Sequence, residues 1–97
     1  MQPNRRWLHV AIGDYFWKAR KEASPRITRK TVADHFGCAD QFVYSFETGR
    51  GALPHSWLPD LIELYGLNQS DVHRQLLKIQ SCYLDAEIKG KVLQKKG

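Results

Sequence analysis

The sequence predicts an all-α protein, and three observations lead to this prediction. Apolar residues recur three and four positions apart, as they do between Val72 and Ala86, which is the spacing of one helix face. The alternation of apolar and polar residues that is typical of strands is missing. Gly37, Gly49 and Gly66 each follow an apolar segment, where a glycine closes a helix. We therefore expect one small helical domain, which suits a chain of 97 residues.

Five helices are expected along the chain. They span roughly Arg6 to Glu22, Arg29 to Phe36, Asp40 to Thr48, Trp57 to Tyr65 and Asp71 to about Lys89. Pro25 prevents the first helix from continuing, and Thr28 can cap the second. Ser56 can cap the fourth helix and Ser70 the fifth. The basic residues around Gly90 are expected to form a frayed tail, because glycine weakens a helix.

The second and third helices, joined by a tight turn at Gly37, form a helix-turn-helix between Ile27 and Gly49. Its inward positions are apolar: Val32, Ala33, Phe36, Cys38, Val43 and Phe46. When Val43 and Phe46 face inward, the polar side chains of the third helix face outward. They are Asp40, Gln41, Tyr44, Ser45 and Thr48. The second helix of such a motif enters the major groove, which makes double-stranded DNA the first partner to consider.

The stretch from Ile27 to Gly49 resembles the helix-turn-helix domains of the Xre family, which includes Cro and the lambda-type phage repressors. The likeness rests on Ala33, Gly37, the apolar positions and the closing Glu47-Thr48-Gly49. The segment from Ile12 to Lys21 is similar to the family's first helix, and the segment from Trp57 to Leu67 is similar to its fourth. The resemblance implies a five-helix lambda-repressor-like domain and a sequence-specific transcriptional regulator, in the simplest case a repressor. It would occupy a promoter, as the compact phage and mobile-element members of the family do.

Positive charge is concentrated at the start of the chain. Residues 1–30 contain eight Lys or Arg residues against two acidic ones, in a chain whose net charge is +5. Lysine and arginine that neutralise phosphates release counterions from DNA, and this release supplies much of the affinity. A solvated cationic surface explains any single one of these residues equally well, but the cluster favours DNA.

The third helix supplies the candidates for base contacts, which are Asp40, Gln41, Tyr44 and Ser45. The Gln41 amide can bind adenine through two hydrogen bonds, and the matching position of the family commonly reaches base edges. Asp40 could accept a hydrogen bond from cytosine or could cap the helix, and both alternatives stay open. Phe42 could contact a thymine methyl group, although packing on the domain itself is the simpler interpretation. Glu47 would repel phosphates unless its carboxylate bonds locally, as the family's glutamate at this place can do.

Five residues are expected to contact phosphates: Arg26, Arg29, Lys30, Thr48 and Arg50. Arg29 opens the second helix, where the family usually places a polar residue against a phosphate and where the helix N-terminus itself favours an anion. Arg50 comes just after Gly49, so the two arginines would hold the DNA backbone from both sides.

The C-terminal helix carries an apolar stripe that is longer than a small domain needs. We expect a DNA-binding domain in residues 1–69 and a C-terminal helix with its tail in residues 70–97. Val72 and Leu76 can cover the helix bundle, but the stripe continues and is expected to pair with its copy in a homodimer. The residues expected to form this dimer are Leu76, Ile79, Tyr83, Leu84 and Ala86. Two recognition helices about 34 Å apart could then enter successive major grooves of a palindromic operator.

Other classes of function find less support in the sequence. Catalysis is not expected, because the chain lacks a glycine-rich phosphate loop, a nucleophile elbow and an apolar pair of carboxylates. Neither a metal site nor a cofactor is expected, since the cysteines and histidines are scattered. No apolar run could cross a bilayer, and a cytoplasmic location is expected. Two alternatives to the regulator stay open: a protein-interaction module, such as an antitoxin or an anti-regulator, and a nonspecific DNA binder.

Overall fold

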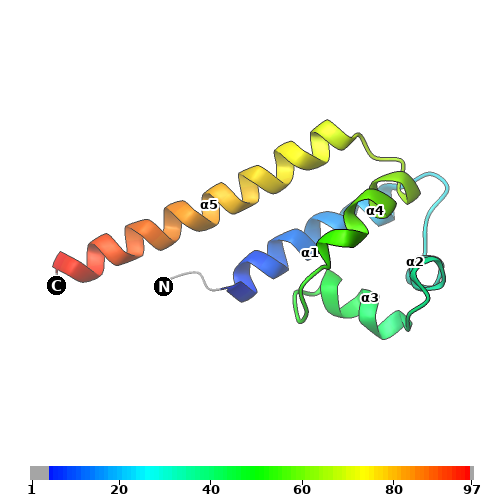
Figure 1. Ribbon diagram of the computed structural model, residues 1–97, viewed down its shortest axis with the longest axis horizontal. Coiled ribbons are helices and arrows are strands. Elements are labelled where there is room, and N and C mark those ends of the chain that lie inside the picture. The colour runs from blue at the N-terminus through cyan, green and yellow to red at the C-terminus, as the bar shows by residue number, and fades with distance from the viewer. Residues whose placement is uncertain (1–4, 97) are drawn as a thin grey trace.

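Helices make up about three quarters of the chain, and turns and loops connect them (Figure 1). The computed structural model describes the backbone of residues 5–96 and the side chains of residues 6–89. The elements are α1 (Arg5–Glu22), α2 (Arg29–Phe36), α3 (Asp40–Glu47), the 3₁₀ helix η1 (His55–Trp57), α4 (Leu58–Leu64) and α5 (Gln69–Lys96). Residues 5–96 contain no strand, so the all-α prediction is confirmed. None of the helices in this part has both the length and the apolar content that a membrane span requires.

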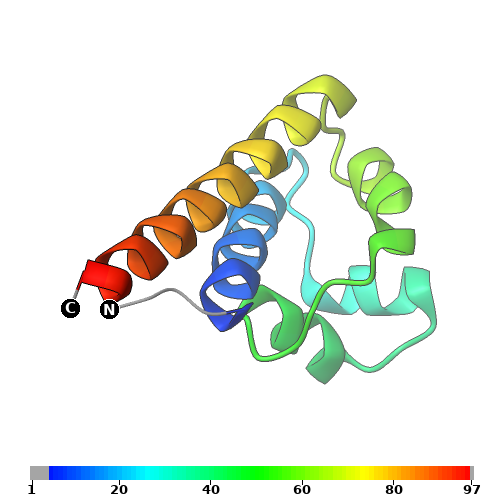
Figure 2. The same ribbon diagram turned by 60° about the vertical axis from the view of Figure 1, so that its left-hand side comes forward.

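The molecule has two parts, which Figures 1 and 2 show from two sides. Residues 5–76, which we call the head, contain α1 to α4 and the first two turns of α5. Residues 77–96 form the stem, the part of α5 that runs beside the beginning of α1 and then past it. α1 and α5 run in opposite directions. The extents of 51 × 28 × 21 Å reflect the projection of the stem from the head.

The core of the head draws residues from all five α-helices. Its buried members are Phe16, Val32, Ala33, Val43, Phe46, Leu61, Tyr65 and Val72. Val72 is 1% exposed, and Leu76, one turn later, packs against the same core. The boundary expected after residue 69 therefore falls inside the packed head, because the first turns of α5 complete its core.

Local sequence determines the shape of the helix-turn-helix. Thr28 caps α2, because its Oγ1 accepts a 3.2 Å hydrogen bond from the backbone N–H of Thr31. Gly37 ends α2 in the left-handed conformation with a φ of 66°, which glycine adopts without steric cost. Gly13 of α1 lets α3 approach closely, since a Cβ at this position would collide with the carbonyl oxygen of Phe46. α3 is thus held directly against α1.

The start of α4 differs from the prediction. Ser56 lies inside η1 rather than at a cap position, and α4 begins after Trp57, which makes no side-chain capping bond. Pro59 lies in the first turn of α4, as expected, where its missing N–H costs little. The 3₁₀ turn takes the place of the hydroxyl cap that the sequence predicts.

Both ends of α5 also differ from the prediction. Asn68 takes the capping place expected of Ser70, and its Oδ1 accepts a 3.1 Å hydrogen bond from the N–H of Asp71. At the other end the helix continues to Lys96, so the prediction of a frayed tail is wrong for the backbone. The side chains of residues 90–97 lie outside the described part of the structure.

Candidate functional site

α3 presents its polar residues on the side that the sequence predicts. Asp40 and Gln41 are exposed, and Tyr44 and Ser45 are half-buried. Asp40 does not cap the helix, because Ala39 is the N-cap residue and offers no side-chain hydrogen bond. The capping alternative is therefore wrong, and Asp40 carries an exposed carboxylate beside Gln41.

The acidic end of α3 is neutralised inside the head. The Glu47 side chain is 1% exposed and accepts two hydrogen bonds from Arg20, one from Nε at 2.7 Å and one from Nη2 at 3.1 Å. Arg20 also donates from Nη1 to the carbonyl oxygen of Ile27 at 2.9 Å. Arg20 is one of the eight basic residues of positions 1–30 that the sequence pattern assigns to a charged surface. It is in fact buried, and it connects α1 to α3. Of the two alternatives for Glu47, the structure shows the hydrogen-bonded one, although the partner is Arg20 of α1 rather than a local group.

Arg29 joins the same ion pair from α2. Its Nε donates to Oε1 of Glu47 at 3.1 Å, and its guanidinium lies 4.9 Å from the centre of the Tyr44 ring. Because two guanidinium groups share one carboxylate, one positive charge is in excess. Arg29 is the accessible member, with 39% of its side chain exposed against 7% for Arg20. The excess charge therefore lies at the surface between α2 and α3.

Two shallow hollows meet at Arg29 and Asp40. The smaller one, of about 310 Å³, is lined by Arg29, Asp40, Gln41 and Tyr44. The larger one, of about 620 Å³, is lined by Trp17, Arg20, Lys21, Arg26, Thr28, Arg29, Lys30 and Asp40. Side chains that could read bases thus adjoin side chains that could hold phosphates. Comparison with protein-family models, with curated proteins and with solved structures finds no match for this chain.

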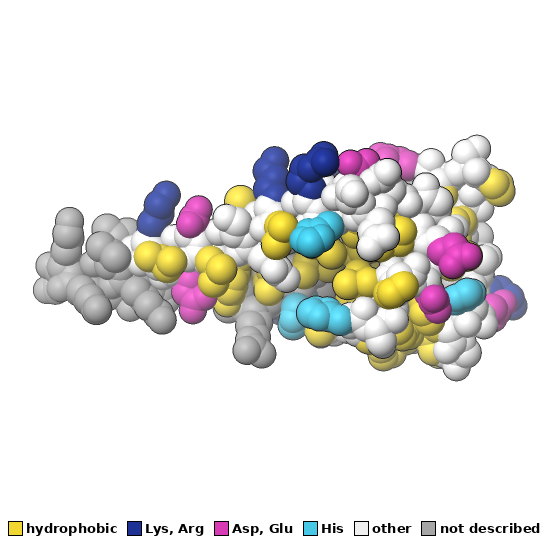
Figure 3. Space-filling view, turned by 45° about the horizontal axis from the view of Figure 1, so that its top comes forward, with side chains coloured by type: hydrophobic (Ala, Val, Ile, Leu, Met, Phe, Trp, Pro, Cys, Tyr) yellow, Lys and Arg dark blue, Asp and Glu magenta, His cyan; other side chains and the backbone are white. Residues whose placement is uncertain are grey.

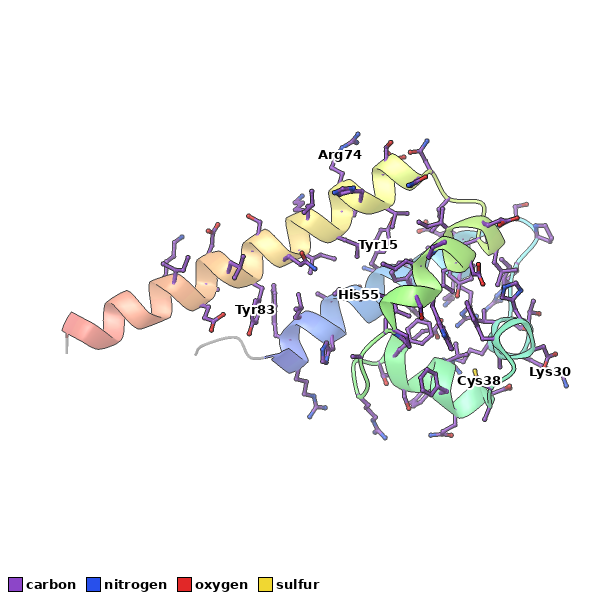
Figure 4. All side chains as sticks on the ribbon, in the orientation of Figure 1. Tyr15, Lys30, Cys38, His55, Arg74 and Tyr83 are labelled. Carbon is purple, nitrogen blue, oxygen red and sulfur yellow. The ribbon has the colours of Figure 1, made fainter. Side chains whose placement is uncertain are left out.

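Lys21 and Trp17 belong to this surface, although neither is among the predicted contact residues. The Nζ of Lys21 lies 4.5 Å from the centre of the Trp17 ring. The two residues are four positions apart on α1, a spacing that places side chains next to each other on a helix. The contact between Lys21 and Trp17 could therefore have been predicted from their spacing in the sequence. Arg26 and Lys30 are exposed, and Lys30 points away from the head in Figure 4.

The far end of α3 does not join the two hollows. Thr48 Oγ1 donates to the carbonyl oxygen of Tyr44 at 2.9 Å, so its only proton is used within the helix end. In the chain without DNA this hydroxyl is therefore used within α3, and the contact of Thr48 with a phosphate stays a prediction. Arg50 has an exposed side chain, and its backbone N–H donates to the carbonyl oxygen of Ser45 at 2.9 Å. The structure therefore brings together Arg26, Arg29 and Lys30 but leaves Arg50 at the opposite end of α3.

Phe42 packs on the head through the aromatic residues of neighbouring elements. Its ring centre lies 5.2 Å from that of Trp57, which stacks on Phe36 at 3.8 Å. The packing interpretation of Phe42 is confirmed. Trp57 covers only part of the Phe42 ring. Phe42 therefore remains 44% exposed, next to the outward face of α3.

The stripe expected to form a dimer faces the chain's own α1 along most of its length. Tyr83 stacks on Trp7 with ring centres 5.9 Å apart, and Figure 4 shows Tyr83 pointing from α5 toward α1. Four members of the stripe are half-buried: Leu76, Ile79, Tyr83 and Ala86. Leu84 is the one predicted dimer residue that is exposed, at 54%. Within the single chain the stripe thus packs largely toward α1, and of the predicted dimer residues only Leu84 is left exposed.

Tyr65 places an unpaired hydroxyl in the core, because its oxygen is buried and has no hydrogen-bond partner among the described residues. Burial raises the pKa of Tyr65, and the Glu47 carboxylate raises it further, while Arg20 acts in the opposite direction. The phenol is therefore protonated at neutral pH.

The described side chains do not form a metal-binding cluster, since no group of three or more His, Cys, Asp or Glu residues among them is arranged to hold an ion. Cys38 is half-buried and Cys82 is exposed, and both are free thiols. The surface around Arg29, where basic, polar and aromatic side chains adjoin, is therefore the candidate functional site.

Proposed function

We propose that this chain is a DNA-binding transcriptional regulator, in which α2 and α3 act as the helix-turn-helix of a lambda-repressor-like domain. The observation that carries the proposal is the continuous surface formed by exposed Gln41 and the basic residues around Arg29. A helix in the major groove reads base edges, while basic groups beside it hold the phosphates. The resemblance to the Xre family points in the same direction.

In this proposal α2 and α3 have different roles on DNA. Lys30 and the arginines of the larger hollow neutralise phosphates, which gives affinity that falls with salt. α3 adds selectivity through Gln41, whose amide reads an adenine, and through Asp40, whose exposed carboxylate can accept from a cytosine. Glu47 does not weaken the attraction, because Arg20 and Arg29 share its charge.

We further propose that the protein binds a palindromic operator as a homodimer and represses transcription by occupying a promoter. The exposed leucines of the stem support a second copy, since single helices with such residues bury them against a partner. Symmetric dimers match the two-fold symmetry of palindromic sites. A regulator of this kind would work in the cytoplasm.

Selection of binding sites from random duplex DNA, followed by substitution of Gln41, tests the proposal. Gln41→Ala should weaken binding to the selected site by about 1 to 3 kcal/mol and leave binding to random DNA unchanged. Gln75→Ala is the matched control, because Gln75 is an exposed glutamine of α5. Equal weakening on both DNAs would favour the nonspecific binder. Failure to select any site at low salt would overturn the regulator.

The phosphate contacts have their own test, in which salt dependence is measured. Lys30→Ala should weaken binding to selected and random DNA alike and reduce the slope of log K against log salt by about 1. Lys78→Ala removes the same charge from the outside of α5 and should change neither quantity. Identical slopes for both variants would exclude Lys30 from the interface.

A protein-interaction module is the second candidate function, and the exposed part of Phe42 favours it. An aromatic side chain that is 44% exposed beside an otherwise polar helix face is typical of a protein interface. If Phe42→Ser leaves binding to a selected site unchanged, Phe42 lies outside the DNA interface. If no site can be selected at all, the protein-interaction module becomes the better proposal.

A further inference from the structure

A second apolar stripe runs along the outer side of α5. Leu77, Leu84 and Ile88 are 54%, 54% and 58% exposed. Their spacing of seven and four residues places them on one helix face. Leu84 comes one residue after Tyr83, which packs inward, so the second stripe is turned by about 100° from the first. Figure 3 shows hydrophobic side chains exposed along this part of α5.

The second stripe continues into a hollow between α4 and α5. This hollow, of about 460 Å³, is lined by Leu58, Pro59, Ile62, Gln69, Val72, His73, Leu76, Leu77 and Gln80. Most of these residues are apolar, and Leu77 belongs to both the hollow and the stripe. The two features therefore form one apolar surface, which extends from the head onto the stem.

Charged residues border the second stripe in a regular way. Arg74 and Asp85 lie along one edge, whereas His73 and Glu87 lie along the other. On one edge Arg74 precedes the stripe's centre, on the other edge His73 precedes it, and on both edges an acidic residue follows it. Arg74 points away from the rest of the head in Figure 4, and its ion pair with Asp71, at 3.4 Å, is exposed to solvent.

We propose that α5 pairs with α5 of a second copy in antiparallel orientation, through Leu77, Leu84 and Ile88. This inference rests on the homodimer of the proposed function, and it names the surface and the orientation of that dimer. When the centre of the pair lies between Gln80 and Ser81, Leu77 faces the partner's Leu84. Because the pair is symmetric, the contact between Leu77 and the partner's Leu84 occurs twice, once on either side of the centre.

Charge complementarity selects the antiparallel orientation. Turning one helix end for end brings the same edge of both helices together, so Arg74 lies within two residues, about 3 Å along the axis, of the level of the partner's Asp85. On the other edge His73 lies within one residue of the level of the partner's Glu87. A parallel pair would bring opposite edges together, which places Arg74 near the partner's His73 and Asp85 near the partner's Glu87. The antiparallel pair therefore joins Arg74 to the partner's Asp85, whereas a parallel pair places two carboxylates, Asp85 and the partner's Glu87, together.

The same arrangement fills the hollow between α4 and α5. His73 lines this hollow, and the partner's Ile88 lies at the level of His73. The distal half of the partner's α5 thus covers apolar side chains of the head, Leu58 and Ile62 among them. Both parts of the apolar surface are buried by one partner.

Self-association of the full chain without DNA tests the surface. Sedimentation equilibrium up to about 100 μM should show a dimer, and Leu84→Gln should raise its dissociation constant by about 100-fold, because the symmetric pair loses two buried leucines. Gln75→Leu, on another face of α5, should change the constant by less than about twofold. A monomer at every concentration would overturn the proposal, as would a dimer that Leu84→Gln leaves unchanged.

Charge reversal tests the edges of the stripe. Arg74→Glu should weaken the dimer by about tenfold, and adding Asp85→Arg to the same chain should restore it to within about threefold. Lys18→Glu makes the same change of net charge at an exposed residue outside α5 and should have no comparable effect. A double variant as weak as the single variant would overturn the antiparallel pairing.

Disulfide formation reports the orientation directly, in chains that also carry Cys38→Ser and Cys82→Ser. A mixture of Leu77→Cys and Leu84→Cys chains should give the mixed disulfide, whereas each variant alone should give none. Self-linked Leu77→Cys or Leu84→Cys chains would indicate a parallel pair and overturn the proposal. Because these experiments contain no DNA, their failure leaves the DNA-binding function standing. A dimer that selects no DNA would overturn that function alone.

Discussion

The head buries a carboxylate, whereas the stem exposes leucine and isoleucine. The side chain of Glu47 is 1% accessible, while Leu84 and Ile88 are 54% and 58% exposed. Both depart from the usual distribution, in which charge lies at the surface and large aliphatic residues lie inside. In the head the departure is compensated within the chain, because Arg20 and Arg29 bind the carboxylate. In the stem the outer stripe is largely open to solvent, although Leu84 also lines a hollow between α1 and α5 together with Leu8 and His9.

This difference shows how two kinds of specificity can be built into one small chain. The buried ion pair connects α1, α2 and α3, so it sets the position of the helix-turn-helix without needing any other molecule. The exposed leucines and isoleucine of the outer stripe of α5 are buried only when a second molecule binds there. Substitutions should therefore have different consequences in the two parts.

Glu47→Ala should produce the largest loss of stability, because it leaves the Arg20 guanidinium buried and unpaired. We expect the free energy of unfolding to fall by about 3–5 kcal/mol, measured by urea denaturation followed by circular dichroism. Replacing both partners, in Arg20→Met/Glu47→Leu, should recover most of that loss, since no charge is then left unpaired. A loss below about 1 kcal/mol for Glu47→Ala would show that the pair is not buried in solution.

Gly13→Ala should also destabilise the head, because the new Cβ collides with the carbonyl oxygen of Phe46. Overpacking of this kind costs about 1–3 kcal/mol, measured by the same denaturation. The sign is diagnostic, since alanine stabilises an unhindered helix by about 1 kcal/mol relative to glycine. A more stable Gly13→Ala variant would contradict the close approach of α1 and α3.

Thr28→Ala should have a smaller effect, since it removes the side-chain cap of α2. We expect a loss of about 1 kcal/mol in the free energy of unfolding. Thr28→Ser keeps the capping oxygen and should lie within a few tenths of a kcal/mol of the original chain. Equal losses for the alanine and serine variants would exclude the cap as the cause.

Leu84→Gln should have the smallest effect on folding, because the residue lies outside the head. At concentrations where the chain is monomeric, the free energy of unfolding should change by less than about 0.5 kcal/mol. Leu61→Ala, in the core, should cost about 2–5 kcal/mol and serves as the contrast. A loss above about 1 kcal/mol for Leu84→Gln would mean that the stem packs against its own chain on this side as well.

The sequence predicts α2 to the residue, because the signals at both of its ends are local. Thr28 and Gly37 act within a few residues of themselves, so their effects can be inferred without the fold. The start of α5 is predicted less well, since Asn68 and Ser70 are both good caps and tertiary packing decides between them. Local chemistry thus defines the motif, while the choice between equivalent caps needs the three-dimensional context.

The ion pair of Glu47 could not be predicted from the sequence, because Arg20 is 27 residues away from it. The apolar stripe on α5 could be predicted from the spacing of its residues, but the segment that packs against it could not. Apolar spacing shows that Tyr83 belongs to a buried face, whereas only the course of α1 shows that Trp7 covers it. Contacts between distant segments are therefore the part of the candidate site that sequence periodicity leaves undetermined.

α5 is one continuous helix from Gln69 to Lys96, so the direction of its outer stripe relative to α3 depends on the number of residues between them. Inserting one residue before Leu77 would rotate the stripe by about 100° and shift it by about 1.5 Å. Inserting seven would restore its direction to within about 20° and lengthen the arm by about 10 Å. The separation of two paired heads could thus change in steps of two helical turns while the same face remains in contact.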